Sequence, residues 1–357
     1  MHFYMPAKVY HESNCVLNHA RELAQLGTHA LIVTGRNSSR KNHSLFDVQD
    51  ALESQKVAFT VFDQVEENPS VETVFAARTA GIEADADFVV GIGGGSPLDA
   101  AKAAALLLNN PECGTELLYH SVPAKAAPVA AIPTTCGTGS EVTGVSVLTR
   151  SDLQTKMSIT HKIFPKLALI DGKYLLNAPR RILVNTAVDA LSHLIESIIN
   201  TKADRYSEMT AYTGLRTWGQ CINIIQGHEE LTVESAQTLM YASTVAGMSI
   251  AQTGTAIPHA LSYYLTARGG IPHGAAVGAF QENYLRKADE TKKRSVLQSV
   301  GLASTEKLGT LIRELTPVTV STELLKESAE SVLGNPQKIK LCPYPLDAKV
   351  MQELISI

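Results

Sequence analysis

The stretch from Ile257 to Gly274 contains the triplet Ile-Pro-His twice, which places His259 and His273 in similar, apolar surroundings. An imidazole buried without a partner is energetically costly. Each histidine therefore needs either a hydrogen-bonding neighbour or a metal ion. A single histidine of this kind is more often a hydrogen-bonded core residue, and the spacing of the two triplets does not decide between these interpretations.

A second pair of candidate ligands lies in the segment NTAVDALSHLIES, where Asp189 and His193 are four residues apart. In a helix, this spacing puts both side chains on one face. One carboxylate and one imidazole on adjacent turns can offer two ligands to a divalent metal. A surface ion pair is the alternative, and these two residues alone favour it. Together with His259 and His273, however, they make a metal site the more economical interpretation.

This ligand set contains no cysteine, so iron(II) and zinc both fit, and nickel and cobalt would also be accepted. One carboxylate and three neutral imidazoles leave a divalent ion with a residual positive charge. Such an ion can polarise a carbonyl or stabilise an alkoxide at an open coordination position.

A glycine-rich turn in DFVVGIGGGSPLDAAKAAALLL connects a buried strand to a helix through residues 93–95. Ser96 is expected to be the N-cap, Pro97 the first helical residue, and Asp99 the carboxylate that reaches back to the helix start. Bare backbone N–H groups at a helix N-terminus suit a pyrophosphate. The alternative is a tight turn that uses glycine for conformation only, and Ser96 stands where a GxGxxG fingerprint would have its last glycine.

A second polar turn, PTTCGTGSE over residues 133–141, also follows an apolar segment. Its hydroxyls and exposed N–H groups could complete a clamp around nucleotide oxygens. Taken alone, this turn is more often just a loop.

The surrounding elements alternate between strands and helices in the first half of the chain, which indicates a mostly parallel, doubly wound α/β domain over residues 1–178. An all-helical domain that holds metal and substrate is expected over residues 179–357. Strands are expected at 29–34, 57–62, 87–92, 128–132 and 167–171, with an inserted hairpin at 145–148 and 156–159 around a polar turn at Arg150–Gln154. Helices are expected at 40–55, 71–81, 98–108, 182–199, 206–221, 235–251 and 309–314.

Composition narrows the class of partner. The chain has 357 residues, a net charge of −4 and a sequence pI near 6.3, which argue against binding to nucleic acid or to an anionic membrane. The five cysteines form no C-x-x-C pair, a pattern typical of reduced thiols in the cytoplasm. No export signal and no membrane span are recognisable in the sequence. Small molecules are therefore the expected partners.

The motifs GGGSPLDAAK, PTTCGTGSEVT, VDALSHLIES and HALSYYLTARGGIPHG, in this order, resemble the iron-containing, group III alcohol dehydrogenases over essentially the whole chain. The resemblance implies a dinucleotide-binding α/β domain, a helical domain, a metal in the cleft between them, and a homodimer, in which the N-terminal FYMPAKVY strand could pair across the interface. It assigns Asp189, His193, His259 and His273 as metal ligands. It also assigns as cofactor contacts Asn68, Gly94, Gly95, Ser96, Asp99, Thr134, Thr135, Thr138, Ser140 and Lys156.

Three positions depart from the family pattern. Tyr263 replaces a histidine that many members carry near the nicotinamide and substrate, and its phenol can still form a hydrogen bond. Gly35 stands where members that prefer NAD often have an aspartate. Together with Ser38, Ser39 and the basic residues 40–41, Gly35 favours the 2′-phosphate of NADP, with NAD possible and a solvated loop as the alternative. Residues 187–188, Ala-Val, replace a frequent Gly-Met pair and can reshape the pocket.

The expected reaction is reversible hydride transfer between the nicotinamide C4 and the carbonyl carbon of a small aldehyde or ketone bound to the metal, with Fe²⁺ the first choice of metal and Zn²⁺ the second. Tyr263 is a candidate helper for the proton. Two other functions remain open. A lyase or cyclase of the dehydroquinate synthase type should have basic residues around the ligands, and residues 189–199 and 257–267 contain none. A non-catalytic sensor of nucleotide and metal is the second alternative.

Overall fold

A six-stranded parallel sheet, in the order β1-β8-β5-β4-β2-β3, organises the first half of the chain. The computed structural model describes residues 1–153 and 155–357. The strands of this sheet are β1 (Lys8–His11), β2 (His29–Gly35), β3 (Ala58–Val65), β4 (Phe88–Gly93), β5 (Val129–Pro133) and β8 (Leu167–Ile170). A separate antiparallel hairpin is formed by β6 (Val147–Arg150) and β7 (Thr155–Ser158).

Both faces of the sheet are buried, as the continuous apolar strands require. In β2, Ala30 and Ile32 join the core on one face, whereas Leu31 and Val33 join the core on the other. The first face is covered by α1 (Cys15–Asn18), α2 (Ala20–Ala24) and α4 (Ser44–Ser54). The second face is covered by α5 (Val71–Glu83), α6 (Gly95–Leu108) and α7 (Glu116–Tyr119). The doubly wound α/β architecture expected from the sequence is therefore confirmed.

Most of the expected elements of this half are present within a few residues, including the hairpin. Gln154, in its expected turn, lies outside the described residues. The helix expected at 40–55 is instead two helices, α3 (Ser38–Lys41) and α4, because His43 has a φ of 66° and cannot continue a right-handed helix. Within the segment FYMPAKVY, residues 8–10 belong to β1, which pairs with β8 of the same chain. Short 3₁₀ turns follow at Ser140–Val142 and Gly172–Leu175.

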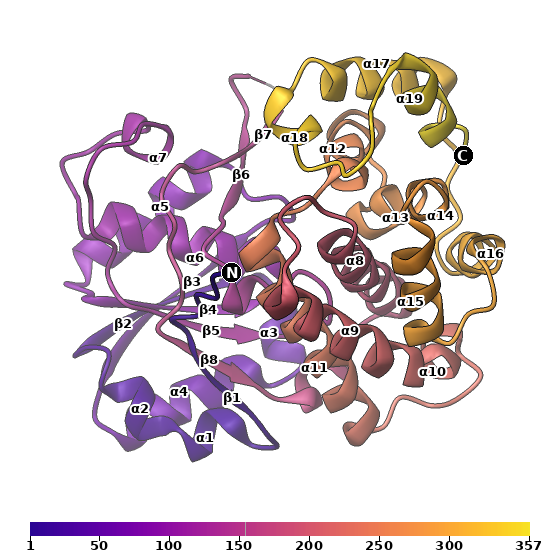
Figure 1. Cartoon of the computed structure of the whole chain (residues 1–357). Coiled ribbons are helices and arrows are strands. Elements are labelled where there is room, and N and C mark those ends of the chain that lie inside the picture. The colour runs from indigo at the N-terminus through magenta and orange to yellow at the C-terminus, as the bar shows by residue number, and fades with distance from the viewer. Residues whose placement is uncertain (154) are drawn as a thin grey trace. The chain divides into compact units, whose positions relative to one another are not determined.

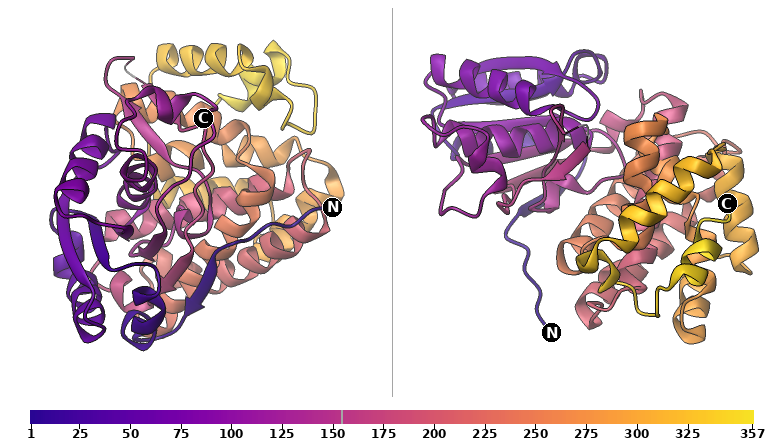
Figure 2. Two further views of the ribbon diagram at one scale, coloured as in Figure 1. Left: turned by 90° about the vertical axis from the view of Figure 1, so that its left-hand side faces the viewer. Right: turned by 90° about the horizontal axis from the view of Figure 1, so that it is seen from above.

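The second half is helical, and the structure shows no strand among its described residues (Figure 2). It begins with α8 (Arg180–Ile198), in which every residue from Ala187 to Ile198 is buried. A helix that is enclosed on all sides can hold polar side chains away from water. The remaining helices are α9 (Arg205–Gln220), α10 (Ile222–Gln226), α11 (Val233–Thr253), α12 (Ile257–Gly269), α13 (His273–Gly278), α14 (Gln281–Arg286), α15 (Glu290–Val300), α16 (Thr305–Leu315), α17 (Thr322–Leu333), α18 (Pro336–Ile339) and α19 (Ala348–Leu354).

Two compact units follow from the internal contacts. The sheet unit contains Met5–Ala178 and Thr232–Met240, and the helical unit contains Met1–Tyr4, Pro179–Leu231 and Tyr241–Ile357. The N-terminal residues Met1–Tyr4 therefore belong to the helical unit, and Thr232–Met240, from the second half of the chain, belong to the sheet unit. None of the helices in the described part of the chain combines the length and the apolar character that crossing a bilayer would require.

Candidate active site

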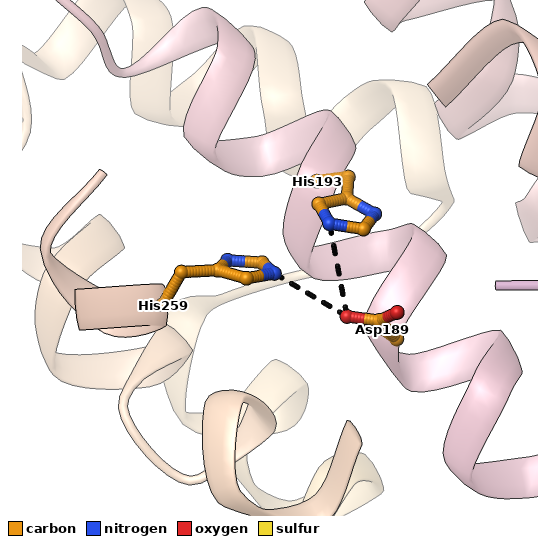
Figure 3. A group of neighbouring side chains, drawn as sticks. All are labelled: Asp189, His193 and His259. Carbon is orange, nitrogen blue, oxygen red and sulfur yellow. Dashed lines mark hydrogen bonds and ion pairs between the residues drawn. The ribbon is translucent and has the colours of Figure 1, made fainter. Parts of the chain in front are cut away.

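Three of the four candidate ligands converge inside the helical unit (Figure 3). Asp189 and His193 lie one turn apart on α8, and His259 is the third residue of α12. Pro258 lies in the first turn of α12, where the missing N–H of a proline costs nothing. The ligand atoms of these three buried residues all lie within 4.8 Å of one another. Asp189, His193 and His259 therefore form a buried metal site.

One carboxylate oxygen is the common point of the cluster. Asp189 Oδ1 lies 3.8 Å from His193 Nε2 and 3.3 Å from His259 Nε2. It also lies 3.6 Å from His273 Nε2. The two imidazole rings of His193 and His259 are stacked, with centroids 4.5 Å apart. Nitrogen and oxygen donors that point at the same small volume are the arrangement a divalent cation needs.

His273 approaches this point from a different direction and is more open. It is the first residue of α13, and 32% of its side chain is exposed, compared with 6% or less for the other three residues. Most of the segment between the two Ile-Pro-His triplets belongs to helix α12. A left-handed glycine, Gly270, ends this helix and turns the chain back.

Gly274 allows α13 to lie directly against α8. A Cβ atom on Gly274 would be 1.8 Å from the carbonyl oxygen of Asn185, which is an impossible distance. The Asn185 side chain also accepts a hydrogen bond from the backbone N–H of Ala275, at 3.0 Å. The position of His273 beside Asp189 therefore depends on glycine at residue 274.

A second carboxylate, Glu196, fixes the orientation of His259. Glu196 Oε1 lies 2.6 Å from His259 Nδ1 and accepts a hydrogen bond from Gln281 Nε2 at 3.0 Å, while Oε2 accepts one from the backbone N–H of Ala256. A carboxylate bonded to Nδ1 holds the proton on that nitrogen, so that Nε2 is the atom that faces Asp189. Glu196 is fully buried and one turn beyond His193 on α8.

The electrostatics of the cluster keep its carboxylates ionised. Burial opposes ionisation of Asp189, but the nearby imidazoles His193, His273 and His259 outweigh burial and hold the pKa of Asp189 well below its usual value. Burial alone would lower the pKa of His259, whereas the charges of Glu196 and Asp189 raise the pKa to about 10. Ionised carboxylates next to imidazoles are the groups that bind a divalent cation.

Tyr263 lies beside His273, and Lys338 lies beside Tyr263. The Tyr263 ring is nearly parallel to the His273 ring, with centroids 6.3 Å apart. The ammonium of Lys338, on α18, lies 6.0 Å from the centroid of the Tyr263 ring. The windows around the ligands, residues 189–199 and 257–267, contain no basic residue. Lys338 comes from the C-terminal region of the chain, outside both windows.

In the sheet unit, the glycine-rich turn differs in detail from the expectation. The helix α6 begins at Gly95 with Gly94 as its N-cap, so Ser96 is inside the helix. A Cβ on Gly95 would be 2.7 Å from the Thr138 side chain, and a Cβ on Gly94 would be 3.1 Å from the Thr135 side chain. These glycines thus permit the second turn to pack against the first, which brings both predicted turns together.

Three of the predicted cofactor residues meet at one place. Ser96 Oγ accepts a hydrogen bond from the backbone N–H of Asn68 at 3.0 Å, and Lys156 Nζ donates to Asn68 Oδ1 at 2.7 Å. Asn68 has a φ of 61°, in the left-handed region that asparagine tolerates. Burial lowers the pKa of Lys156 to about 8. A partly buried cation next to a helix N-terminus is chemistry that fits the phosphates of a dinucleotide.

Asp99 does not reach back to the start of its helix. Its Oδ1 accepts a hydrogen bond from Ser140 Oγ at 2.6 Å, and its Oδ2 accepts one from the backbone N–H of Val147 at 2.9 Å. Lys102, fully buried one turn later, donates to Ser140 Oγ at 2.6 Å and lies 3.6 Å from Asp99 Oδ1. Asp99 and Ser140 therefore hold the second turn in place.

The predicted 2′-phosphate region is only partly exposed. Gly35 ends β2, and Ser38 is exposed nearby, whereas Ser39 is fully buried and faces the protein interior. Arg40 is exposed and pairs with Asp63 at 2.8 Å. In the second turn, Thr134 is buried, and Thr135 and Thr138 are half-buried.

Comparison with known proteins identifies the relatives of this architecture. A family model described as iron-containing alcohol dehydrogenase matches residues 6–172, and the C-terminal model of the Fe-containing alcohol dehydrogenase family matches residues 183–332. The chain belongs to the iron-containing alcohol dehydrogenase family. The crystal structure of an iron-containing alcohol dehydrogenase from Thermotoga maritima is 34% identical, with a TM-score of 0.90 over 99% of this chain and 98% of that chain.

Characterised relatives in the family are more distant. A long-chain primary alcohol dehydrogenase from Thermoanaerobacter ethanolicus is 32% identical over 70% of this chain and 63% of its own length. An NADPH-dependent butanol dehydrogenase from Clostridium saccharobutylicum is 29% identical over 77% of this chain and 71% of its own length. The match thus spans less than two thirds of the first of these relatives.

Sequence reasoning missed three residues of these clusters: Glu196, Lys102 and Lys338. Glu196 is an acidic residue in an otherwise apolar stretch, and it follows Asp189 by seven residues, which is two helical turns. Both features could have indicated that Glu196 faces the same site as Asp189. Lys102 follows Asp99 by three residues in a helix of apolar side chains, and it carried a similar signal. No local pattern connects Lys338 with the site.

Proposed function

We propose that the chain is a metal-dependent, NAD(P)-linked alcohol dehydrogenase or aldehyde reductase that acts on small alcohols and carbonyl compounds. The observation that carries this proposal is the convergence of Asp189, His193 and His259 on one buried point, with His273 at its open side. A buried set of one carboxylate and three imidazoles suits a divalent cation, Fe²⁺ first and Zn²⁺ second.

When bound, the cation would polarise the substrate oxygen and the nicotinamide would supply or accept the hydride. The protein's own contribution is orientation. Glu196 holds the Nδ1 proton of His259, and the enclosed helix α8 keeps water from Asp189 and His193. The half-buried Tyr263, beside His273, is positioned to donate a hydrogen bond from its phenol to a substrate oxygen.

For the cofactor, we assign the pyrophosphate to the two packed turns of the sheet unit. Asn68, Ser96 and Lys156 form one side, and the backbone at Gly94 and Gly95 forms the other, with Thr134, Thr135 and Thr138 on the second turn. We assign Asp99 and Ser140 to holding that turn. The exposed Ser38 and the small Gly35 leave room for the 2′-phosphate of NADP, while NAD remains the alternative cofactor. Residues 1–178 would form the cofactor domain and residues 179–357 the metal domain.

We also propose a homodimer that works in the cytoplasm. Exposed apolar side chains occur close together at the N-terminus and on α9, where Phe3 and Tyr206 are in ring contact with centroids 6.0 Å apart. Met209, on the same helix as Tyr206, is 59% exposed. An apolar surface of this kind favours a second copy of the chain. The five cysteines are all free thiols, as a reducing compartment requires.

The decisive test uses protein that is purified without oxygen and loaded with Fe²⁺ or Zn²⁺. Oxidation of NADPH is followed with short aldehydes, and reduction of NADP with the matching alcohols. Turnover that disappears after chelation supports the proposal, whereas its absence with every metal and both cofactors would refute it. A preference for NADH would refute the role of Gly35, and in that case Gly35→Asp should not change the preference further.

A further inference from the structure

The metal site of the helical unit is closed on three sides and open on one. The side chains of Asp189, His193 and His259 are 6% exposed or less, whereas His273 is 32% exposed. The half-buried Tyr263 lies beside His273, with ring centroids 6.3 Å apart, and Thr255 and Lys338 are also half-buried.

Lys338 brings a positive charge next to Tyr263 and Thr255. Its Nζ lies 3.2 Å from Thr255 Oγ1, 3.4 Å from the Thr255 carbonyl oxygen, and 6.0 Å from the Tyr263 ring centroid. Thr255 directly precedes Ala256, whose backbone N–H is bonded to Glu196. The ammonium is therefore linked through Thr255 and Tyr263 to the segments that carry His259 and His273.

The charge of Lys338 is not neutralised by the protein. Among residues 1–153 and 155–357, no carboxylate forms an ion pair with Lys338, although the chain as a whole is acidic and most other half-buried lysines are paired. An ammonium has three N–H groups, and Thr255 offers it only two neutral acceptors, both at long distances. An anion would bind there more strongly than either of these acceptors does.

We propose that Lys338 recognises an anionic group at the far end of the substrate. The substrate would be a small aldehyde or alcohol that carries a carboxylate, sulfonate or phosphate, with its reacting oxygen at the His273 side of the metal cluster. The Tyr263 ring lies between His273 and the ammonium in the series of contacts, and it provides an apolar surface for the carbon chain. This inference deepens the proposed function and rests on it.

A structural role is the competing explanation, because Lys338 also holds the turn before α12 through Thr255. The two roles predict different measurements. A lysine that only holds this turn affects reduction of every aldehyde to the same degree. A lysine that binds the substrate changes the ratio between charged and uncharged aldehydes of equal length.

The test compares 4-oxobutanoate with butanal, which have the same number of carbon atoms. With the metal-loaded protein and NADPH, we expect kcat/KM to be at least about tenfold higher for 4-oxobutanoate, because a charge-assisted hydrogen bond supports only this substrate. In Lys338→Met this ratio should fall about 10- to 100-fold. Lys338→Arg should retain most of the preference, and Lys340→Met, an exposed neighbour, should retain all of it.

Aldehydes of similar length with a sulfonate or a phosphate ester identify which anion is preferred. The proposal would be overturned if the wild-type protein reduced butanal with the same kcat/KM as each of the three anionic aldehydes. Equal losses for charged and uncharged aldehydes in Lys338→Met would also overturn it and would assign Lys338 to holding the turn.

Calorimetric titration of the Zn²⁺-loaded protein with 4-hydroxybutanoate and with 1-butanol separates this inference from the proposed function. Binding of 4-hydroxybutanoate that weakens at least about tenfold in Lys338→Met supports the anion site, even in a protein that shows no turnover. Binding that is the same in both proteins refutes the anion site, even when dehydrogenase activity is present.

Discussion

Two carboxylates, the half-buried Asp99 and the buried Asp189, have opposite surroundings in the two units. Asp99, in the sheet unit, is accompanied on its own helix by the ammonium of Lys102, and both share the Ser140 hydroxyl. Asp189, in the helical unit, has only imidazoles around it, and no lysine or arginine of the described residues forms an ion pair with it. The first cluster is neutralised by a lysine, whereas the second contains only imidazoles, which can exchange their protons for a metal ion.

This difference shows why burial of a charge does not by itself indicate a ligand site. Around Asp99, every hydrogen bond and charge is used to hold the segment between β5 and β6. Around Asp189, the Nε2 atoms of three histidines surround one carboxylate oxygen. Glu196 adds a second negative charge behind His259. The carboxylates and imidazoles around Asp189 can therefore bind a metal cation, whereas Asp99 is already paired with Lys102 and cannot.

The largest effect is expected for Asp189→Ala. Loss of the shared ligand should remove the bound metal and lower kcat/KM by at least about 1000-fold, because a cation that polarises the substrate oxygen contributes several kcal/mol. Mass spectrometry measures the metal content, and turnover of an aldehyde measures kcat/KM. Asp50→Ala, at an exposed position, is the control. A variant that keeps its metal and its activity would contradict the assignment.

Lys102→Met is the corresponding break in the self-paired cluster. It leaves the half-buried Asp99 without its fully buried cation, so the free energy of unfolding should fall by about 3 kcal/mol in urea denaturation. Metal affinity should stay the same.

The double variant Asp99→Asn/Lys102→Met should recover part of this loss, because it removes both charges. A double variant that loses the sum of the single losses would show that the two charges do not stabilise each other.

Glu196→Gln tests the carboxylate behind His259. A glutamine cannot hold the Nδ1 proton as strongly, so we expect metal affinity to fall about 10- to 100-fold. Competition with a chromophoric zinc chelator measures this change without turnover. Glu234→Gln, on an exposed position of α11, should have no effect. Equal affinities for the wild type and Glu196→Gln would reduce Glu196 to a packing residue.

Ser140→Ala should have a smaller effect than either charge variant. The hydroxyl links Lys102 to Asp99, but the two charges remain to attract each other after its removal. A cost of about 1 kcal/mol in the free energy of unfolding is expected, with metal affinity unchanged. A loss as large as that of Lys102→Met would show that the hydroxyl, and not the ion pair, holds the cluster together.

The smallest effect is expected for NADPH affinity, through the charge of Lys156. Unlike Lys102, Lys156 is bonded to a neutral group, the side-chain amide of Asn68. Burial lowers the pKa of Lys156 to about 8, so the ammonium is present below that pH and is lost above it. Affinity for NADPH should therefore fall several-fold from about pH 7 to about pH 9. Lys156→Arg should remove this pH dependence, which fluorescence titration of NADPH can measure.

The candidate metal ligands could be predicted because their spacing has local meaning. Asp189 and His193 are one helical turn apart, and the prolines beside His259 and His273 indicate fixed backbone. The strands of the sheet were recognisable for a similar reason, since continuous apolar runs are typical of strands that are buried on both faces. Prediction failed where an interaction links distant segments. The helix starts at Gly95 instead of Pro97, and the two glycines at this start pack against Thr135 and Thr138 of a distant turn.

The sequence by itself determined the doubly wound sheet, the helical second half, and the residue types that can hold a metal. These properties follow from periodicity and from the chemistry of side chains a few positions apart. Only the tertiary structure decided that Asp99 is paired within the protein, that Glu196 lies behind His259, and that Lys338 lies next to Tyr263. Each of these depends on which segments pack together, and the free energy of that packing is not contained in any local pattern.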